Sequence, residues 1–432
     1  MRPKLFLFLI AASVLAACLP LHAQLTLLLE EPYSRDGTFA GTGHAAVYLS
    51  RVCAETAVVL RRCAEGETGV VLSRYHGLAG YDWIAVPLIP YLYAVKTADE
   101  IPLFADSKLV AFLRQQYLPE LKAIVREGSS GAPAGPWYEL LGSAYDRTLY
   151  GFRISTTPQQ DDELIRKLNS SPNRDSYNLV TRNCADFVRQ IINFYYPKAV
   201  HRSVIGDLGV TTPKQAAKSL VRYSKHHPQV RLTTFVIPQV PGLKRSKRVH
   251  GVLESVLFAK KYMAAVLVLH PVVAGSMEVA YWTGWHFDPA LHAAVFDPER
   301  GLESPISHAE RHRYQSLIQD VKRASEAETF EVPAAWPQLE TRAQPDLDSS
   351  GHPMLQIEVS GRNVKMGICR ANALRTSAPP ELLEQLLLTR LDQELKPGTP
   401  PRASQREIEE DWKLLQRSLS GFPVQLAHKN QP

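Results

Sequence analysis

Two short stretches of this chain carry the residue types that nucleophilic catalysis requires. His44 follows Gly41-Thr42-Gly43 and begins an apolar run, and Cys184 comes 140 residues later, directly after Asn183. A thiol becomes a strong nucleophile once it loses its proton, and a nearby histidine can take that proton. We therefore predict that Cys184 is a nucleophile and that His44 is its base.

The residues around Cys184 favour this interpretation. Asn183 is of a type preferred at helix N-caps, and apolar residues recur at helical spacing until Pro197 ends the pattern. The first turn of a helix favours negative charge on a sulfur, and its backbone N–H groups can form part of an oxyanion hole. The alternative is that Cys184 only fills the core, because free cysteine is often buried.

A catalytic histidine needs a third group to orient its ring. His76, which follows the third β-type run, is our candidate, with Ser73 and Asp82 as alternatives. Tyr177 precedes Cys184 by seven residues and could line the pocket or donate to an oxyanion, although strand packing is the simpler interpretation. Asn183 is assigned to the same pocket.

No motif points to a metal or a cofactor. The chain has no Cys-x-x-Cys, no clustered carboxylate loop and no phosphate-binding glycine loop, so we expect neither a metal site nor a cofactor. The net charge of +6 is too small by itself to indicate nucleic-acid binding, and we expect no such partner.

The N-terminus predicts export from the cytoplasm. Arg2 and Lys4 precede an apolar run of the length found in signal peptides. Two cleavage sites compete: residues 1–17 would form a lipoprotein leader before a lipidated Cys18, or residues 1–23 would form an ordinary signal peptide. Both predict a bacterial periplasmic or cell-envelope location. In such an oxidising compartment Cys53 and Cys63 could form a disulfide, or remain two free thiols.

The hydrophobic patterns predict strands followed by helices in a first unit that ends near residue 200. Three β-type runs look like a meander, at 45–49, 57–60 and 69–72, and helical periodicity follows at 107–126, 157–168 and from Cys184. The C-terminal region, 286–432, is expected to be a mixed α/β accessory unit with a hairpin and three helices. It carries no chemical motif, so a structural or partner-binding role is its default.

The middle region, residues 201–285, is basic and then strongly apolar. Residues 263–281 approach the length of a membrane span. Burial in a core as a helix or strand pair is the simplest interpretation. The alternatives are a transmembrane helix and a membrane-surface element with a basic collar.

The two motifs resemble the circularly permuted branch of the NlpC/P60 papain-like superfamily, to which lecithin:retinol acyltransferase is related. Gly43-His44-Ala45-Ala46-Val47 matches its strand histidine, and Arg182-Asn183-Cys184 matches its helix-opening cysteine. More narrowly, the chain resembles the bacterial family named for the periplasmic domain of a lipoprotein N-acyltransferase. It departs from that family's motifs at Thr42, which replaces an aromatic residue, and at Ala185-Asp186-Phe187, which replaces Ala-Thr-Arg.

The resemblance covers residues 28–200 and implies an α+β papain-like core, with an antiparallel sheet and packed helices, in which Cys184 forms a thioester with the help of His44. It also implies lipid or lipoprotein substrates at a membrane face. Two other functions remain open on the sequence: a cell-wall peptide amidase or endopeptidase with the same residues, and a non-catalytic envelope scaffold that binds partners through residues 286–432.

Overall fold

The computed structural model describes residues 23–33, 40–121, 123–125, 132–204, 206–258, 267–282, 286–327, 343–359, 361–375, 377–396 and 403–419. Residues 1–22 of the predicted leader, including Cys18, lie outside the described residues, so both cleavage predictions remain expectations.

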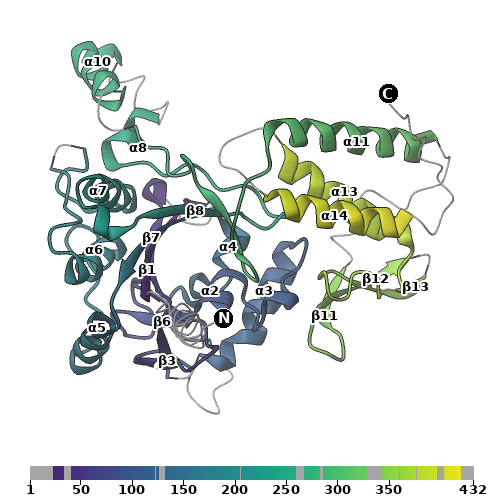
Figure 1. Ribbon diagram of the computed structural model, residues 1–432, viewed down its shortest axis with the longest axis horizontal. Helices are drawn as coiled ribbons and strands as arrows, with labels where there is room; N and C mark the ends of the chain where they lie inside the picture. The colour runs from purple at the N-terminus through teal and green to yellow at the C-terminus, as the bar shows by residue number, and fades with distance from the viewer. Residues whose placement is uncertain are drawn as a thin grey trace, which may run out of the picture.

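The fold is α+β, as predicted, and it is built on an eight-stranded sheet (Figure 1). The strand order is β10-β9-β8-β7-β1-β2-β5-β6, and all neighbours are antiparallel except β8 and β9. The strands are β1 (Ala23–Glu30), β2 (His44–Leu49), β5 (Val70–Ser73), β6 (Ile84–Pro87), β7 (Leu149–Thr156), β8 (Thr233–Ile237), β9 (Ala294–Asp297) and β10 (Gly301–Glu303).

The predicted meander differs from the observed pairing. Strand β2 pairs directly with β5, and the run between them forms a separate hairpin of β3 (Val52–Thr56) and β4 (Val59–Arg62). A disulfide joins Cys53 to Cys63 across this hairpin. The main sheet also takes β8, β9 and β10 from beyond residue 200, where the sequence pattern placed the end of the first unit.

Helices cover both faces of the sheet. On one face α5 (Pro158–Ser170), α6 (Cys184–Tyr195) and α7 (Pro213–His226) pack against alternate residues of β1 and β2, such as Leu27 and Ala45. On the other face α2 (Leu88–Tyr93), α3 (Ser107–Tyr117) and α4 (Ser143–Asp146) pack against the intervening residues, such as Leu28 and Ala46. Because side chains alternate along a strand, β1 is buried on both sides. Each fully buried leucine there stabilises the fold by about 2 kcal/mol.

The C-terminal region is a smaller α+β unit packed against the first. It consists of a three-stranded sheet, β11 (Gln344–Leu347), β12 (Pro353–Val359) and β13 (Arg362–Gly367), with the helices α11 (His308–Ala327), α13 (Pro380–Leu395) and α14 (Gln405–Leu419). Buried Arg390 donates to the Leu103 carbonyl at 2.7 Å and pairs with Asp411 at 2.7 Å. The region is therefore anchored to the first unit through a charged group that has partners.

A short segment projects from the body of the molecule. Helix α10 (Pro271–Ala280) lies beyond α8 (Val252–Phe258), away from the sheet (Figure 1). Its apolar residues include Val272, which is 81% exposed, so the prediction that this run is buried in a core is wrong for the described residues. Among the residues described, no helix is both long enough and apolar enough to cross a bilayer.

The remaining short helices are 3-10 turns: η1 (Ala40–Thr42), η2 (Ala98–Glu100), η3 (Leu118–Glu120), η4 (Trp137–Leu140) and η5 (Pro228–Val230). The first of these leads directly into His44. Gly43 has a φ of +70°, and a Cβ at this position would lie 2.1 Å from the Glu30 carbonyl oxygen. Only glycine allows β2 to begin this close to β1.

Candidate active site

Cys184 is the first residue of helix α6. The side chain of Asn183 accepts a hydrogen bond from the Asp186 N–H at 2.9 Å, and Asp186 accepts one from the Asn183 N–H at 3.5 Å. This reciprocal pair is a capping box, which satisfies two backbone donors at the start of the helix. The predicted helix start at Cys184 is confirmed.

Buried polar contacts fix this helix start to the chain that follows it. The carboxylate of Asp186 is fully buried and accepts hydrogen bonds from Thr211 at 2.6 Å and Arg202 at 2.8 Å. The amide of Asn183 donates to the carbonyls of Leu179 and Thr211, at 2.9 and 3.0 Å. The side chain of Asn183 therefore serves as cap and anchor, and oxyanion donors would come from the backbone.

The sulfur of Cys184 lies at the end of strand β2 where His44 is located. Burial raises the pKa of the Cys184 thiol to about 11, although the backbone N–H groups of Ala45 and Ala185 face the sulfur and act in the opposite direction. Ala45 directly follows His44, and α6 packs against β2. Tertiary structure thus brings the two predicted catalytic residues to one strand end, and the thiol is protonated at neutral pH.

His44 is held by residues of strand β5 and the turn after it. Its Nε2 lies 2.7 Å from the Ser73 hydroxyl oxygen, and its ring stacks on Tyr75 with 4.5 Å between centroids. Burial, followed by the charge of Arg147, lowers the pKa of His44 to about 3. The imidazole is therefore neutral in the resting protein.

His76, our candidate for the orienting group, lies elsewhere. Strand β5 ends at Ser73, and the chain turns through Gly77, which has a φ of +65°. This turn takes His76 to the surface, where its ring lies 5.2 Å from that of Tyr177. The side chain within hydrogen-bond distance of the His44 ring in the structure is that of Ser73, not His76.

Tyr177 and Asp82 have distinct surroundings. Tyr177 is half-buried, and its pKa is raised by burial and then by the nearby charge of a Cys184 thiolate, which places its hydroxyl in the neighbourhood of the sulfur. Asp82 pairs with Arg74 at 2.6 Å and with Arg182 at 3.2 Å. Its carboxylate is therefore engaged by arginines.

Arg74 has a positioning role that the sequence pattern missed. Its side chain is buried, donates to the Asn183 carbonyl at 3.4 Å and lies over the Phe187 ring at 4.9 Å. It thus connects the end of β5, next to Ser73, to the start of α6. An arginine after an apolar strand gives no local signal of this role, because Asn183 and Phe187 lie more than a hundred residues further along the chain.

Glu30, a buried charged residue next to His44 in the sheet, was also not predicted from the sequence pattern. Glu30 of β1 lies opposite His44 of β2 in the sheet register. Its carboxylate accepts a hydrogen bond from the Tyr91 hydroxyl and lies 3.6 Å from Arg147. The charge of Glu30 raises the pKa of Cys184, and that of Arg147 lowers the pKa of His44. Glu30 and Arg147 thus disfavour the thiolate of Cys184 and the imidazolium of His44, respectively. Glu30 ends an apolar strand, so periodicity alone predicts only burial there.

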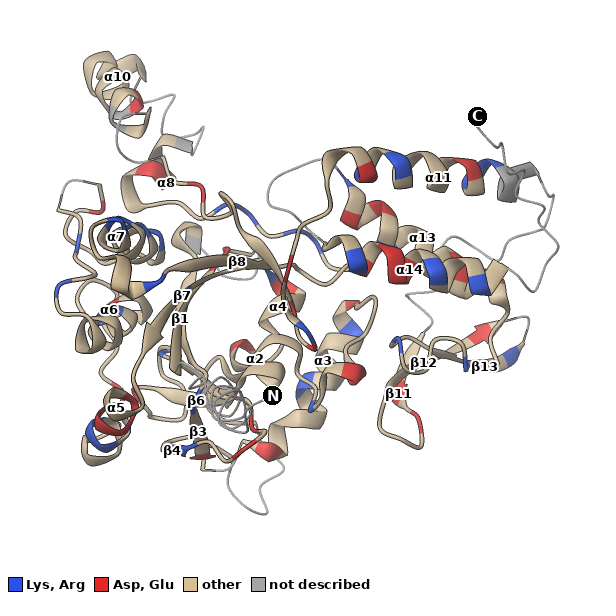
Figure 2. Cartoon of the chain, in the orientation of Figure 1, with Lys and Arg blue, Asp and Glu red and all other residues tan. Residues whose placement is uncertain are grey.

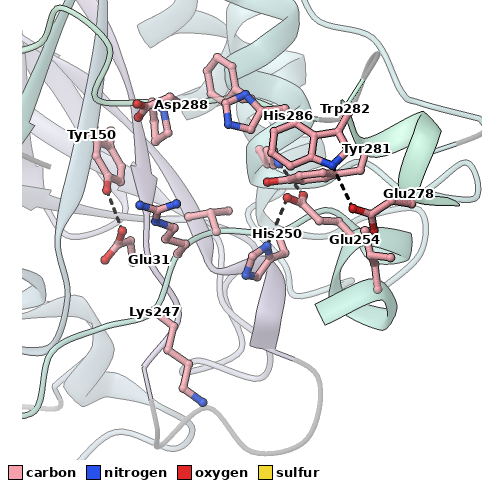
Figure 3. A pocket seen from close by; sticks show the side chains of 16 residues that line it. Glu31, Tyr150, Lys247, His250, Glu254, Glu278, Tyr281, Trp282, His286 and Asp288 are labelled. Carbon is pink, nitrogen blue, oxygen red and sulfur yellow. Dashed lines mark hydrogen bonds and ion pairs between the residues drawn. The ribbon is translucent and has the colours of Figure 1, made fainter. Parts of the chain in front are cut away.

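A cavity of about 670 Å³ lies beside this strand end (Figure 3). Glu31, which follows Glu30, accepts a hydrogen bond from the Tyr150 hydroxyl at 2.7 Å on one wall. The far wall carries Trp282, whose indole donates to Glu278 at 2.9 Å. The His250 N–H donates to the Gly41 carbonyl at 3.1 Å, so this wall is attached to the turn before His44.

Two groups of side chains in the described part of the chain have the spacing of metal ligands, and both lie away from Cys184. Glu394, Glu407 and Asp411 surround the guanidinium of Arg390. The other group contains Cys53 and Cys63, which are joined in a disulfide. Both groups are therefore accounted for by structural contacts.

Comparison with known proteins adds no argument about the function of this site. No family model matches the chain, and no curated protein matches it. Among solved structures, the crystal structure of a type VI secretion system effector, TseH, is similar over 49% of this chain and 97% of that chain. The sequence identity is 15% and the TM-score is 0.24, a level at which the likeness carries no argument about function.

Proposed function

We propose that this protein is an exported cysteine-nucleophile acyl-transfer enzyme that acts on lipid or lipoprotein acyl groups, with Cys184 as nucleophile and His44 as base. One observation carries the proposal. The sulfur of Cys184 sits at a helix N-terminus and faces the N–H of Ala45, the residue directly after His44. A buried thiol in that position is surrounded by the donors that an acyl-transfer reaction needs.

The proposed reaction begins from a neutral pair. Because the thiol and the imidazole both resist charge, proton transfer from Cys184 to His44 accompanies attack on the acyl carbonyl carbon. If Nε2 carries the ring proton and donates it to Ser73, Nδ1 has the lone pair that accepts the thiol proton. The negative oxygen that forms would face the backbone N–H groups at the start of α6.

The thioester then forms as the leaving group departs. His44 returns its proton to the leaving oxygen or nitrogen, which restores the neutral imidazole. An amine or water next attacks the thioester carbon, His44 takes a proton from it, and the Cys184 sulfur leaves and is reprotonated. Transfer to an amine would give an acyltransferase, and transfer to water would give a hydrolase.

Two further features support the details of this proposal. The disulfide between Cys53 and Cys63 is typical of proteins that work in oxidising compartments, which supports export to the bacterial periplasm or cell envelope. The cavity near this strand end is not lined by Cys184 or His44, but Leu257 and Phe287 are among its lining residues, and such apolar side chains suit an acyl chain.

A non-catalytic scaffold is the second candidate. The observation that favours it is the burial of Cys184, which is only 8% exposed and has a raised thiol pKa. A cysteine that serves only packing would show the same two properties.

Trapping of the acyl-enzyme tests the proposal. Purified mature protein would be mixed with p-nitrophenyl esters of short, medium and long acyl chains, quenched in acid and measured by intact-protein mass spectrometry. We expect one acyl group on Cys184, which hydroxylamine removes and which Cys184→Ala lacks. Cys369→Ala is the matched control, because Cys369 is the other buried free thiol in the described residues.

The identity of the acyl donor that reacts with Cys184 distinguishes acyl transfer from amide cleavage and from a non-catalytic scaffold. Preference for long chains supports lipid or lipoprotein substrates, whereas cleavage of a cell-wall peptide amide with no acylation by long chains would support the amidase alternative. Absence of adducts from every ester and amide, in a protein shown to be folded, would favour the scaffold.

A further inference from the structure

Exposed apolar side chains are concentrated on one side of the molecule. Seven of them, between 51% and 81% exposed, lie in residues 267–282: Leu267, Val268, Leu269, Val272, Val273, Val279 and Trp282. Soluble proteins rarely expose contiguous apolar patches of this kind without a binding role.

Four more exposed apolar side chains connect this segment to the site. Leu179 and Val180 lie in the loop just before Cys184, and Val204 and Leu208 lie in the loop before α7. The two loops are joined where Arg202 donates to the Thr181 carbonyl at 3.1 Å. The second loop reaches α8 where the Val252 N–H donates to Asp207 at 2.8 Å. Eleven of the fifteen exposed large apolar side chains in the described residues thus form what we call the apolar face.

The shape of α10 excludes one role for this face. The helix has ten residues, so it is about 15 Å long and cannot cross a hydrocarbon core of about 30 Å. Its exposed apolar residues include Val272, Val273 and Val279, whereas Ala274 is buried and the helix contacts α8. A largely apolar helix that is attached by one side and projects from the body can enter one leaflet of a bilayer.

Aromatic residues lie at the base of α10. Tyr281 and Trp282 follow the helix directly, and the Trp282 ring stacks with His286 at 6.1 Å (Figure 3). Tyrosine and tryptophan prefer the headgroup level of membranes, where the ring is half apolar and half wet.

Helix α7 adds a basic stripe on the same side. Lys218, Arg222 and Lys225 recur at spacings of four and three, and α7 contains no acidic residue. Lys214, one turn earlier, is buried and pairs with Glu254 of α8, which ties the start of α7 to the protruding segment. Figure 2 shows blue segments on α7, below α8 and α10 in that view. A basic stripe beside an apolar tip is complementary to anionic headgroups above an acyl layer.

We propose that the apolar face docks on the surface of an anionic lipid bilayer, with residues 267–282 inserted into one leaflet and α7 against the headgroups. Docking in this way would hold the loop before Cys184, with Leu179 and Val180, at the lipid surface. The inference goes beyond the proposed reaction, because docking depends on no catalytic residue.

Vesicle co-sedimentation tests the docking. The mature protein would be mixed with vesicles of phosphatidylcholine alone and with vesicles that also contain phosphatidylglycerol. We expect tighter binding to the anionic vesicles. The double variant Val272→Asp with Val273→Asp should bind both kinds about tenfold more weakly or worse. Arg222→Glu with Lys225→Glu should lose the preference for anionic lipid.

Matched controls separate docking from folding and from catalysis. Leu374→Asp changes an exposed apolar residue of the C-terminal region and should bind as the wild type does. Cys184→Ala should also bind normally, so failure of the reaction and failure of docking can be distinguished. Equal melting temperatures would show that the variants are folded.

Two results would overturn the docking proposal. The first is absence of wild-type binding to both vesicle types, or equal binding by the Val272 and Val273 double variant. The second is a dimer in sedimentation velocity without lipid that this double variant dissociates, together with no vesicle binding, since the apolar face would then be covered by a second copy of the chain.

Discussion

The described part of the chain contains two buried free thiols, and their surroundings have opposite polarity. Cys184 lies at a helix start, where backbone N–H groups face the sulfur and stabilise negative charge on it. Cys369 lies against carbonyl oxygens, with its Sγ 3.1 Å from that of Glu100, and nearby acidic groups add to the effect of burial in raising its pKa. Burial alone therefore does not distinguish a nucleophile from a packing residue, but the direction of the surrounding dipoles does.

The comparison also extends to proton acceptors. His44 begins the strand against which the Cys184 helix start packs, whereas Cys369 is surrounded by the carboxylates of Glu100, Asp348 and Asp99 and by carbonyl oxygens. In both places the thiol is neutral at rest. In the proposed reaction the neutral imidazole of His44 takes the Cys184 proton at the moment of attack, which is general base catalysis.

Replacement of His44, the proposed base, should change the reactivity of Cys184 more than any other substitution discussed below. We expect His44→Gln to lower the rate of acylation at Cys184 by about 10² to 10⁴ fold, because general base catalysis contributes about that much. Stopped-flow release of p-nitrophenol measures the rate. A rate within about threefold of the wild type would show that His44 does not act as the base.

The two thiols should also differ in the pH at which they are alkylated. The pKa of Cys184 is about 11, so its thiolate is about one part in ten thousand at pH 7 and rises tenfold per pH unit. Burial and then the charges of Glu100 and Asp348 raise the pKa of Cys369 further, so Cys184 should be labelled first as the pH increases. Iodoacetamide labelling followed by peptide mass spectrometry would test this order.

A different outcome of that titration would change the mechanism. If labelling of Cys184 reaches a plateau below about pH 7, a thiolate–imidazolium pair already exists in the free protein. The neutral pair proposed here would then be incorrect, although the enzyme proposal would remain.

His44 should also affect stability in acid. Its pKa is about 3 in the folded protein and 6.5 in the unfolded chain, so between these values the unfolded chain binds more protons. Stability therefore falls as the pH decreases from 6.5 to about 3, by about 1.4 kcal/mol per pH unit at most. In His44→Gln this contribution should be absent. Urea unfolding at several pH values measures it, with His226→Gln on the exposed side of α7 as the control.

Loss of the helix cap should have the smallest effect. Asn183→Ala removes the side chain that accepts from the Asp186 N–H, and we expect a loss of about 1–2 kcal/mol in the free energy of unfolding. Since Asn183 also anchors the loop before Cys184, acylation should slow as well. Asn183→Asp retains the acceptor, so its stability should lie closer to that of the wild type.

The sequence by itself determined the local structure at the site. The N-cap at Asn183, the helix that begins at Cys184 and the strand that begins after Gly43 depend on residues a few positions apart, so periodicity and capping rules predict them. Each of these features has a signal in its own residues, although β2 is held by its pairing with β1 and β5 and the start of α6 by contacts with Arg202 and Thr211.

Only the tertiary structure decided which distant groups meet. Ser73 rather than His76 contacts His44 because β5 pairs with β2 and ends there, and Arg74 reaches Asn183 across more than a hundred residues. The joining of β8 to β7 and the exposure of residues 267–282 were likewise decided by long-range packing. Strand pairing and burial of charge depend on partners far away in the chain, and a local hydrophobic pattern carries no information about those partners.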